Sequence, residues 1–317
     1  MNRNKNFLTS QGETVSRTAF GGWAIGGEYW GPQEHKDSVR AIHMALKLGV
    51  NHFDTAPVYG KGRSEQLIGQ QLKKVREHCL IATKAFYTDP ETLQKSFETS
   101  LKRLLTDYID IFYIHWPLSG RDMRPGMEVL EKLRTQGRIR SIGVSNFSLN
   151  QIRMVQEAGT VDIYQGGYNI LWPRLEEKIL PFCRDQNIEF IPYGVLAQGI
   201  LTERGIEKLQ QTHKGFRHKM ILYRQEMHAQ LLPLLKQIKD VCSRRGWSVE
   251  NCVTAYTIEQ TVSPSVLLGV RNRTQAESNF NLPGGPLPEE IRQVLQNCRL
   301  KVNSFIPDAE NMFDHKS

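Results

Sequence analysis

The sequence predicts a (β/α)8 barrel, and three features of the chain support this fold class. Short apolar segments typical of buried strands alternate with amphipathic segments of helical spacing from residue 19 to residue 280. Eight such strand–helix units suit a barrel of this architecture. No Pro- or Ser-rich linker divides the chain, so residues 1–317 are expected to form a single domain. A doubly wound sheet, the alternative, normally carries a GxGxxG motif after its first strand, and the sequence contains none.

The expected elements follow from this alternation. Strands are expected at residues 19–23, 51–55, 79–85, 109–115, 140–144, 162–166, 188–193 and 265–269. Helices are expected at residues 34–48, 63–74, 90–104, 124–136, 148–158, 174–186 and 274–280. Ser148 with Gln151, and Thr274 with Glu277, have the spacing of a capping box. Both pairs predict a helix that begins directly after a strand.

Several segments lie outside the regular alternation. Residues 7–18 are expected to form a polar hairpin that turns at Gly12. Residues 202–228 form a long polar loop after the seventh strand, where a lid or a binding loop is more common than an insertion without function. Further helices are expected at 231–246, 248–260 and 288–300, and the last residues are expected to fray.

The charge of the chain favours a small anionic ligand over a nucleic acid. The formal net charge is +8, from 41 Lys and Arg against 33 Asp and Glu. Basic residues gather modestly within 204–224, 243–246 and 271–273, whereas acidic residues are scattered. Nucleic-acid binding would need a continuous basic stripe, and no recognition motif is present. A local positive excess suits a phosphorylated cofactor better.

Cysteine usage and hydropathy indicate the compartment. The chain has five cysteines and no CxxC pair: Cys79, Cys183, Cys242, Cys252 and Cys298. Residues 1–10 lack the apolar centre of a signal peptide, and no apolar run is long enough to cross a bilayer. Free thiols in a reducing compartment are therefore expected, which favours a cytoplasmic protein. No metal site and no membrane partner are expected, and a monomer is favoured.

Chemically active side chains follow three neighbouring strands. Asp54 and Tyr59 lie at the exit of the second expected strand, within the segment NHFDTAPVYG. Lys84 lies near the end of the third strand, and His115 lies at the end of the fourth. A carboxylate at the end of a buried strand needs partners. Because the carboxyl ends of all barrel strands share one face, these four side chains predict a single site there.

Several motifs occur in a fixed order along almost the whole chain. They are FDTAPVYGKGRSEQLIG, ATK, DIFYIHWP, GRIRSIGVSNF, VLAQGIL and LLGVRNRTQAESNF. On these motifs the sequence resembles the aldo-keto reductases, and most closely their prokaryotic monomeric members. The resemblance implies reduction of aldehydes or ketones by a nicotinamide cofactor, because no side chain can donate a hydride.

The resemblance also implies a role for each of the four residues at the strand exits. Tyr59 is expected to be the general acid, with Lys84 lowering the pKa of its phenol. Asp54 is expected to keep Lys84 charged and oriented. His115, as a neutral imidazole, is expected to orient the substrate carbonyl and to stabilise charge on its oxygen.

Cofactor contacts are implied in the same way. Ser145, Asn146 and Gln165 are expected to bind the nicotinamide amide, and Tyr193 to stack on the nicotinamide ring. The segment 196–201 is expected to wrap the pyrophosphate. The full expected set is Gly22, Trp23, Ser145, Asn146, Gln165, Tyr193, Leu196, Gln198, Gly199, Leu201, Gly269, Arg271, Gln275 and Asn279.

Two arginines near the last strand favour NADPH over NADH. Arg271 and Arg273 stand at the start of a helix, where free N–H groups already attract an anion such as a 2′-phosphate. Arg271, two residues after Gly269, is the preferred contact. Arg217 or Lys219, from the long loop, compete for the same role.

Aromatic residues on the catalytic side predict the walls of the substrate pocket: Trp23, Trp30, Phe86 and Trp116. Such walls suit aldehydes and flat or apolar carbonyl compounds, and they also stack on sugar rings. The direction of the reaction stays open, because a dehydrogenase oxidising alcohols would use the same residues.

One alternative belongs to a different class of protein. The same barrel serves as a regulatory subunit of potassium channels, where bound nicotinamide acts as a redox sensor. Those subunits carry a long N-terminal extension, whereas only residues 1–18 precede the first expected core strand here. An enzyme is therefore the favoured interpretation.

Overall fold

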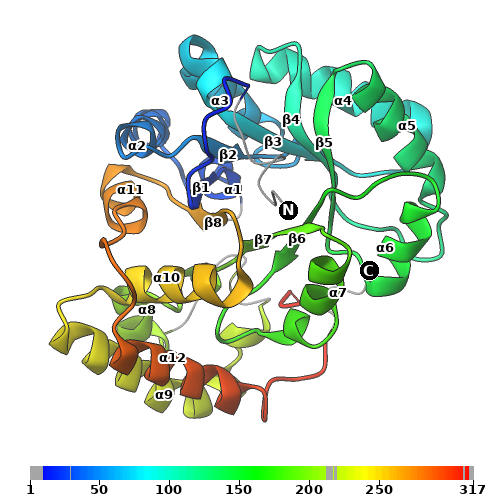
Figure 1. The fold of residues 1–317 in the computed structure, drawn as a ribbon. Helices are drawn as coiled ribbons and strands as arrows, with labels where there is room; N and C mark the ends of the chain where they lie inside the picture. Colours follow the sequence, from blue (N-terminus) through cyan, green and yellow to red (C-terminus); the bar gives the residue numbers. More distant parts are fainter. Residues whose placement is uncertain (1–9, 29, 212–216, 218–219, 310, 314–317) are drawn as a thin grey trace.

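Eight parallel strands form a nearly closed barrel with helices around it (Figure 1). The computed structural model describes residues 10–28, 30–211, 217, 220–309 and 311–313. The strands are β1 (Thr18–Gly21), β2 (His52–Asp54), β3 (Leu80–Ala85), β4 (Ile109–Ile114), β5 (Ile139–Ser145), β6 (Ile163–Gly167), β7 (Glu189–Tyr193) and β8 (Val266–Gly269). Their order is β7-β6-β5-β4-β3-β2-β1-β8. The (β/α)8 barrel predicted from the sequence is confirmed.

The two ends of the sheet meet between β7 and β8. These strands lie side by side, and the hydroxyl of Ser263, just before β8, donates to the carbonyl of Phe190 over 2.7 Å. Because all neighbouring strands are parallel, their carboxyl ends open at one rim of the barrel. We call this rim the mouth.

Strand alternation decides which side chains point into the barrel. Side chains along a strand alternate between its two faces, so Leu80, Ala82 and Lys84 of β3 share one face. Leu80 and Ala82 belong to the small apolar cluster that fills the barrel, together with Ile111 and Tyr113 of β4. Lys84 is therefore directed into the barrel at the level of the mouth, while the outward residues of the strands pack against the helices.

Most helices lie where the alternation predicts them. They are α2 (His35–Lys47), α3 (Arg63–Leu72), α4 (Pro90–Leu104), α5 (Arg124–Thr135), α6 (Leu149–Gln156), α7 (Ile179–Asp185), α10 (Val249–Thr261), α11 (Arg273–Phe280) and α12 (Glu289–Val302). The hydroxyl of Ser148 accepts from the N–H of Gln151 and completes the expected capping box of α6. The capping box expected at Thr274 is wrong. Asn272 caps α11 instead, because its side chain accepts from the N–H of Gln275.

Short elements add to the expected pattern. They are α1 (Trp23–Gly26), α8 (Glu203–Lys208), η1 (Lys73–His78), η2 (Arg174–Glu176), η3 (Ala197–Gly199) and η5 (Ile221–Tyr223). The segment 202–228 is thus partly helical, and α9 (Gln225–Arg244) begins at Gln225 rather than at residue 231. Residues 212–216 and 218–219 of this loop, and residues 7–9 of the expected hairpin, lie outside the described residues.

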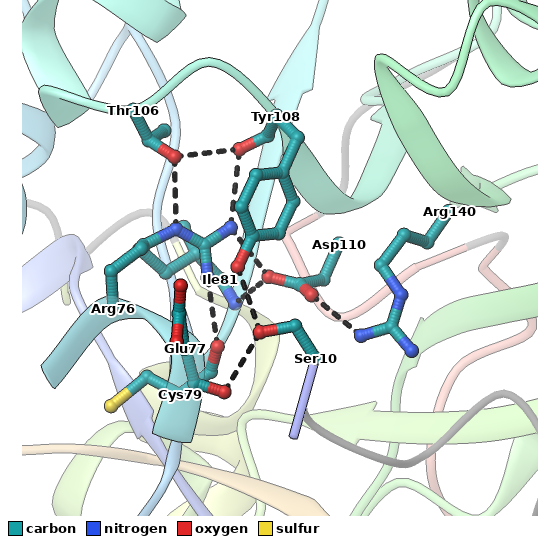
Figure 2. A network of polar contacts seen from close by, with 9 residues as sticks. All are labelled: Ser10, Arg76, Glu77, Cys79, Ile81, Thr106, Tyr108, Asp110 and Arg140. Carbon is teal, nitrogen blue, oxygen red and sulfur yellow. Dashed lines mark hydrogen bonds and ion pairs between the residues drawn. The ribbon is translucent and has the colours of Figure 1, made fainter. Parts of the chain in front are cut away.

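A polar network ties the strands together at the barrel end opposite the mouth (Figure 2). The carboxylate of Asp110 accepts from the guanidinium of Arg76 at 2.7 Å, from the guanidinium of Arg140 at 2.9 Å and from the N–H of Ile81 at 2.9 Å. The guanidinium of Arg76 also lies 3.9 Å from the ring centroid of Tyr108. Active sites of (β/α)8 barrels lie at the mouth, so this network at the opposite end stabilises the fold.

Two further observations concern membrane-spanning helices and the cysteines. Among the described residues, no helix is both long enough and apolar enough to span a bilayer. The five cysteines are free and buried.

Candidate active site

Three strand ends bring Asp54, Lys84 and His115 to the mouth. Asp54 ends β2, Lys84 is the penultimate residue of β3, and His115 directly follows β4. The Nζ atom of Lys84 lies 2.5 Å from Oδ1 of Asp54, and the two side chains are 0% and 3% exposed. The sequence prediction that these residues share one site agrees with this arrangement.

The Asp54–Lys84 pair is fully hydrogen-bonded. Lys84 also donates to the backbone carbonyl of Thr55 over 2.9 Å. The side-chain amide of Gln165, at the middle of β6, donates to the second carboxylate oxygen of Asp54 over 2.9 Å. Both oxygens of the carboxylate therefore have partners, as a buried charge requires.

Tyr59 lies above this pair. Its hydroxyl lies 3.5 Å from Nζ of Lys84, at the outer limit of a hydrogen bond. Its ring stacks on Trp23 with 6.2 Å between centroids and meets the ring of His115 edge-on at 5.9 Å. The four residues predicted to be catalytic thus form one group.

Two glycines hold the loop of Tyr59 against α1. Gly60 has a φ of +62°, and a Cβ atom there would lie 2.3 Å from the carbonyl oxygen of Gly26. A Cβ atom on Gly26 would in turn lie 2.8 Å from the backbone of Tyr59. Only glycine permits this approach of the two backbones, which fixes Tyr59 beside Trp23.

Burial works against both charges of the ion pair. It raises the pKa of Asp54 above its ordinary value, while the Lys84 ammonium and the bonds from Lys84 and Gln165 oppose that shift. It lowers the pKa of Lys84, while Asp54 opposes that shift. The pair is held together because each partner offsets the desolvation of the other.

Burial keeps Tyr59 and His115 neutral. It raises the pKa of the Tyr59 phenol well above 10.0, and the nearby Asp54 carboxylate raises it further. The pKa of Tyr59 is therefore raised in the protein alone and not lowered as the sequence analysis expected, because desolvation is the largest influence. Burial and the Lys84 ammonium lower the pKa of His115 well below 6.5, which agrees with the expected neutral imidazole.

The ends of β5, β6 and β7 form the other side of the mouth. The hydroxyl of Tyr193 donates to Oδ1 of Asn146 over 2.6 Å. The Nδ2 atom of Asn146 donates to Oγ of Ser145 over 3.0 Å and to the carbonyl of His115 over 3.1 Å. Asn146 has a φ of +65°, a conformation that asparagine tolerates better than most residues. This chain of bonds links the expected nicotinamide residues to the backbone of the catalytic group.

The loop after β7 has an unusual backbone. Ala197, Gln198 and Gly199 have φ values of +46°, +52° and +105°. Left-handed conformations of non-glycine residues cost about 1–2 kcal/mol each, and they concentrate at functional sites. The carbonyl of Gln198 accepts from the guanidinium of Arg217 over 3.1 Å and from the hydroxyl of Tyr223 over 3.0 Å, which holds the loop in this form.

Arg217 connects the two sides of the mouth. Its guanidinium lies 5.1 Å from the ring centroid of Trp30, which lies in the loop between α1 and α2. A Cβ atom added to Gly199 would meet no atom nearer than Nη2 of Arg217 at 3.7 Å, so the backbone here is open on one side. Lys219, the other loop residue considered from the sequence, lies outside the described residues.

Arg271 and Arg273 have different surroundings. The guanidinium of Arg271 donates to the side chain of Gln33 and to the backbone carbonyls of Trp30, Gly31 and Pro32. These four bonds use most of its five N–H groups, so this side chain anchors the 30–33 loop. Arg273 is exposed and pairs with Glu277 one turn along α11 at 3.0 Å.

The remaining expected cofactor residues are held by hydrogen bonds or by packing within the protein. Gln275 accepts from the N–H of Arg271 over 2.8 Å. Asn279 donates to the carbonyl of Gly269 over 3.5 Å. Close packing explains the glycine at position 22, because a Cβ atom there would lie 2.5 Å from Oγ of Ser64. Leu196 is partly buried against the core and Leu201 is fully buried.

The expected aromatic walls surround His115 and Tyr59. Phe86 is 41% exposed and stacks on His115 with 5.0 Å between ring centroids. Trp23 and Trp30 meet edge-on at 5.0 Å. Trp116 lies 6.5 Å from the ring of Phe313, a residue of the C-terminal segment that the sequence analysis did not place at the site. No pattern around Phe313 in the sequence signals this position.

A parallel eight-stranded barrel with a buried Asp–Lys pair, a tyrosine and a histidine at its mouth defines an enzyme site of the (β/α)8 class. The model of the aldo/keto reductase family matches residues 17–298, and the chain belongs to this family. It is an NAD(P)H-dependent oxidoreductase.

Similar proteins cover nearly the whole chain. The aldo-keto reductase YhdN of Bacillus subtilis is 31% identical over 307 residues, which are 92% of this chain and 93% of the relative. The NADH-specific methylglyoxal reductase of Escherichia coli is 32% identical over 292 residues, which are 84% and 89% of the two chains. The solved structure of the glycerol dehydrogenase AKR11B4 from Gluconobacter oxydans has a TM-score of 0.83 and 28% identity, and covers 97% of this chain and 98% of that one.

Proposed function

We propose that the protein reduces aldehydes or ketones with NADPH, and that Tyr59 is the proton donor. The observation that carries this proposal is the position of the Tyr59 hydroxyl, 3.5 Å from Nζ of Lys84, above a buried pair of Lys84 and Asp54. Burial keeps the phenol protonated at neutral pH, which is the state that an acid needs before it donates.

The surrounding residues support the proton transfer. When Tyr59 donates its proton to the developing alkoxide, the ammonium of Lys84 stabilises the phenolate that is left. Asp54 holds Lys84 in place for this task. Within the described residues, the Nδ1 atom of His115 is buried and has no hydrogen-bond partner, so a substrate oxygen would satisfy it.

The mouth also fits a nicotinamide dinucleotide. The cofactor, when bound, supplies the hydride. Ser145 and Asn146 at the end of β5 and Gln165 on the neighbouring β6 present hydroxyl and amide groups side by side, which suit the carboxamide of nicotinamide. Tyr193 presents a ring beside them for stacking, and the strained loop 197–199 with Arg217 suits the pyrophosphate.

The preference for NADPH rests on charge near the start of α11. Arg273 is a cation there whose exposed ion pair with Glu277 is easily exchanged for a phosphate. Arg271 positions the 30–33 loop rather than contacting the phosphate, because its guanidinium already makes four bonds. NADH stays the alternative, since the relative from Escherichia coli is NADH-specific.

The substrate class follows from the aromatic walls. Trp23, Phe86 and Trp116 favour small aldehydes such as methylglyoxal and flat or apolar carbonyl compounds over highly charged ones. Oxidation of an alcohol is the second candidate, because the related solved structure is a glycerol dehydrogenase and the same residues serve both directions.

A direct test measures coenzyme consumption in both directions. Wild-type protein is assayed with NADPH and with NADH against methylglyoxal, an aromatic aldehyde and an aldose, and with NADP+ and NAD+ against glycerol. We expect the highest turnover with NADPH and an aldehyde. Coenzyme binding without turnover of any compound in either direction would contradict the proposal.

A further inference from the structure

The C-terminal segment Asn311–Phe313 lies in the mouth of the barrel. Figure 1 shows the chain after α12 returning towards the strands. The ring of Phe313 stacks on Tyr193, with 6.2 Å between centroids and only 6° between the planes. It also meets Trp23 edge-on at 6.1 Å and lies 6.5 Å from Trp116. Phe313 therefore stands between the ring expected to stack on nicotinamide and two walls of the substrate pocket.

Met312 is docked at the same place. Its side chain is 2% exposed, and its sulfur accepts from the amide of Gln198 over 3.2 Å. A Cβ atom added to Gly167 would lie 2.8 Å from its methyl carbon, and one added to Gly194 would lie 3.2 Å from its sulfur. Met312 thus rests directly on the glycines that end β6 and follow β7.

The chain before Met312 is anchored separately. The carbonyl of Ile306 accepts from the guanidinium of Arg174 over 2.8 Å, and Ile306 is 5% exposed. The carbonyl of Met312 accepts from the N–H of Ile221 over 3.3 Å. Residues 311–313 can leave the mouth by breaking the bond between Met312 and Ile221, while Ile306 keeps the preceding chain attached to the barrel.

We propose that Met312 and Phe313 act as an intramolecular competitor of the coenzyme. One face of Tyr193 cannot stack on Phe313 and on a nicotinamide ring at the same time, and Gln198 is engaged by Met312 rather than by a dinucleotide. Coenzyme binding therefore requires this segment to withdraw. The inference rests on the proposed function, because it takes Tyr193 and Gln198 as coenzyme residues.

The competition has a predictable size and sign. The apparent dissociation constant equals the intrinsic one divided by the fraction of molecules whose site is open, so it rises as the segment covers more of the sites. Removing an aromatic stack of ordinary strength should release the site and tighten coenzyme binding by about 3- to 10-fold. A segment that instead clamped the bound coenzyme would give the opposite sign.

The test measures NADP+ and NAD+ binding by isothermal titration calorimetry. Phe313→Ala and Met312→Ala are compared with the wild-type chain and with Phe305→Ala, which removes a ring of equal size from the same terminal segment without touching Tyr193. We expect tighter binding of both coenzymes by the first two variants and no change for the control. Unchanged or weaker binding by Phe313→Ala would overturn the competition while leaving the proposed function intact.

Hydrogen exchange supplies a second readout. Saturating the wild-type protein with NADP+ should speed amide exchange at Asn311, Met312 and Phe313, because these residues leave the mouth. Slower exchange there would overturn the proposal. If neither coenzyme bound the wild-type chain or any variant, the proposed function would fall and this inference with it.

Discussion

The ammonium of Lys84 and the carboxylate of Asp54 form a 2.5 Å pair from which solvent is almost wholly excluded. Removing one partner of such a pair leaves a buried charge without compensation, which typically costs about 3–5 kcal/mol. Lys84→Met and Asp54→Asn should each lower the free energy of unfolding by about this amount, measured by urea denaturation.

The double variant provides the control for this pair. Neither charge remains in the protein that carries both Asp54→Asn and Lys84→Met. Its free energy of unfolding should therefore fall by clearly less than the sum of the two single decreases. Additive losses would show that the two side chains do not depend on each other.

Tyr59 is expected to act in proton transfer and not in coenzyme binding. Tyr59→Phe removes the hydroxyl near Lys84 but keeps the ring that stacks on Trp23, so the walls of the mouth stay in place. Turnover of an aldehyde should fall at least ~10²-fold, as is usual when a general acid is lost. The dissociation constant of the coenzyme should stay near its wild-type value.

A tyrosine far from the mouth gives the matched control. Tyr108→Phe removes a hydroxyl that donates to Ser10 at the opposite end of the barrel (Figure 2) and should leave turnover unchanged. Wild-type turnover by Tyr59→Phe would remove Tyr59 from the proposed mechanism.

The sequence predicted the parts of the structure that depend on local pattern. All eight strands and the grouping of Asp54, Lys84 and His115 followed from apolar alternation and from the rule that barrel strands open at one face. The capping box at Ser148 was predicted equally well, because its hydrogen bonds join residues only three apart.

Features that depend on distant partners could not be predicted. The guanidinium of Arg271 is bound by a loop that lies more than two hundred positions away in sequence, at residues 30–33. Phe313 reaches Tyr193 only because the chain returns after α12. The direction of the Tyr59 pKa shift depends on how completely the fold buries its hydroxyl, which no motif encodes.

His52 should make stability depend on pH. Its imidazole is buried inside the barrel, and burial, helped by the Lys84 ammonium, lowers its pKa from 6.5 to about 3. Between these two pH values the unfolded chain binds a proton that the folded chain does not, so stability falls as the pH is lowered from 6.5 towards 3. One such group contributes a slope of up to about 1.4 kcal/mol per pH unit.

The measurement compares His52→Gln with the wild-type chain by urea denaturation at several pH values from 7 to 4. The variant should show a shallower loss of stability on acidification, whatever its absolute stability at pH 7. Parallel curves for the two proteins would mean that His52 is protonated equally in the folded and unfolded chains.

Variants of Arg271 and Arg273 should distinguish direct contact with a phosphate from support of the 30–33 loop. Arg273→Ala should weaken NADP+ binding by about 1.5–3 kcal/mol, as expected for lost charge-assisted hydrogen bonds to a phosphate, and leave NAD+ binding nearly unchanged. Arg271→Ala should weaken both coenzymes alike, because it frees the 30–33 loop that carries Trp30. Titration calorimetry with both coenzymes measures these differences, and Glu277→Gln, which releases Arg273 from its ion pair, should favour NADP+ slightly. A loss confined to NADP+ in Arg271→Ala would instead assign the phosphate to Arg271, which the sequence alone favoured.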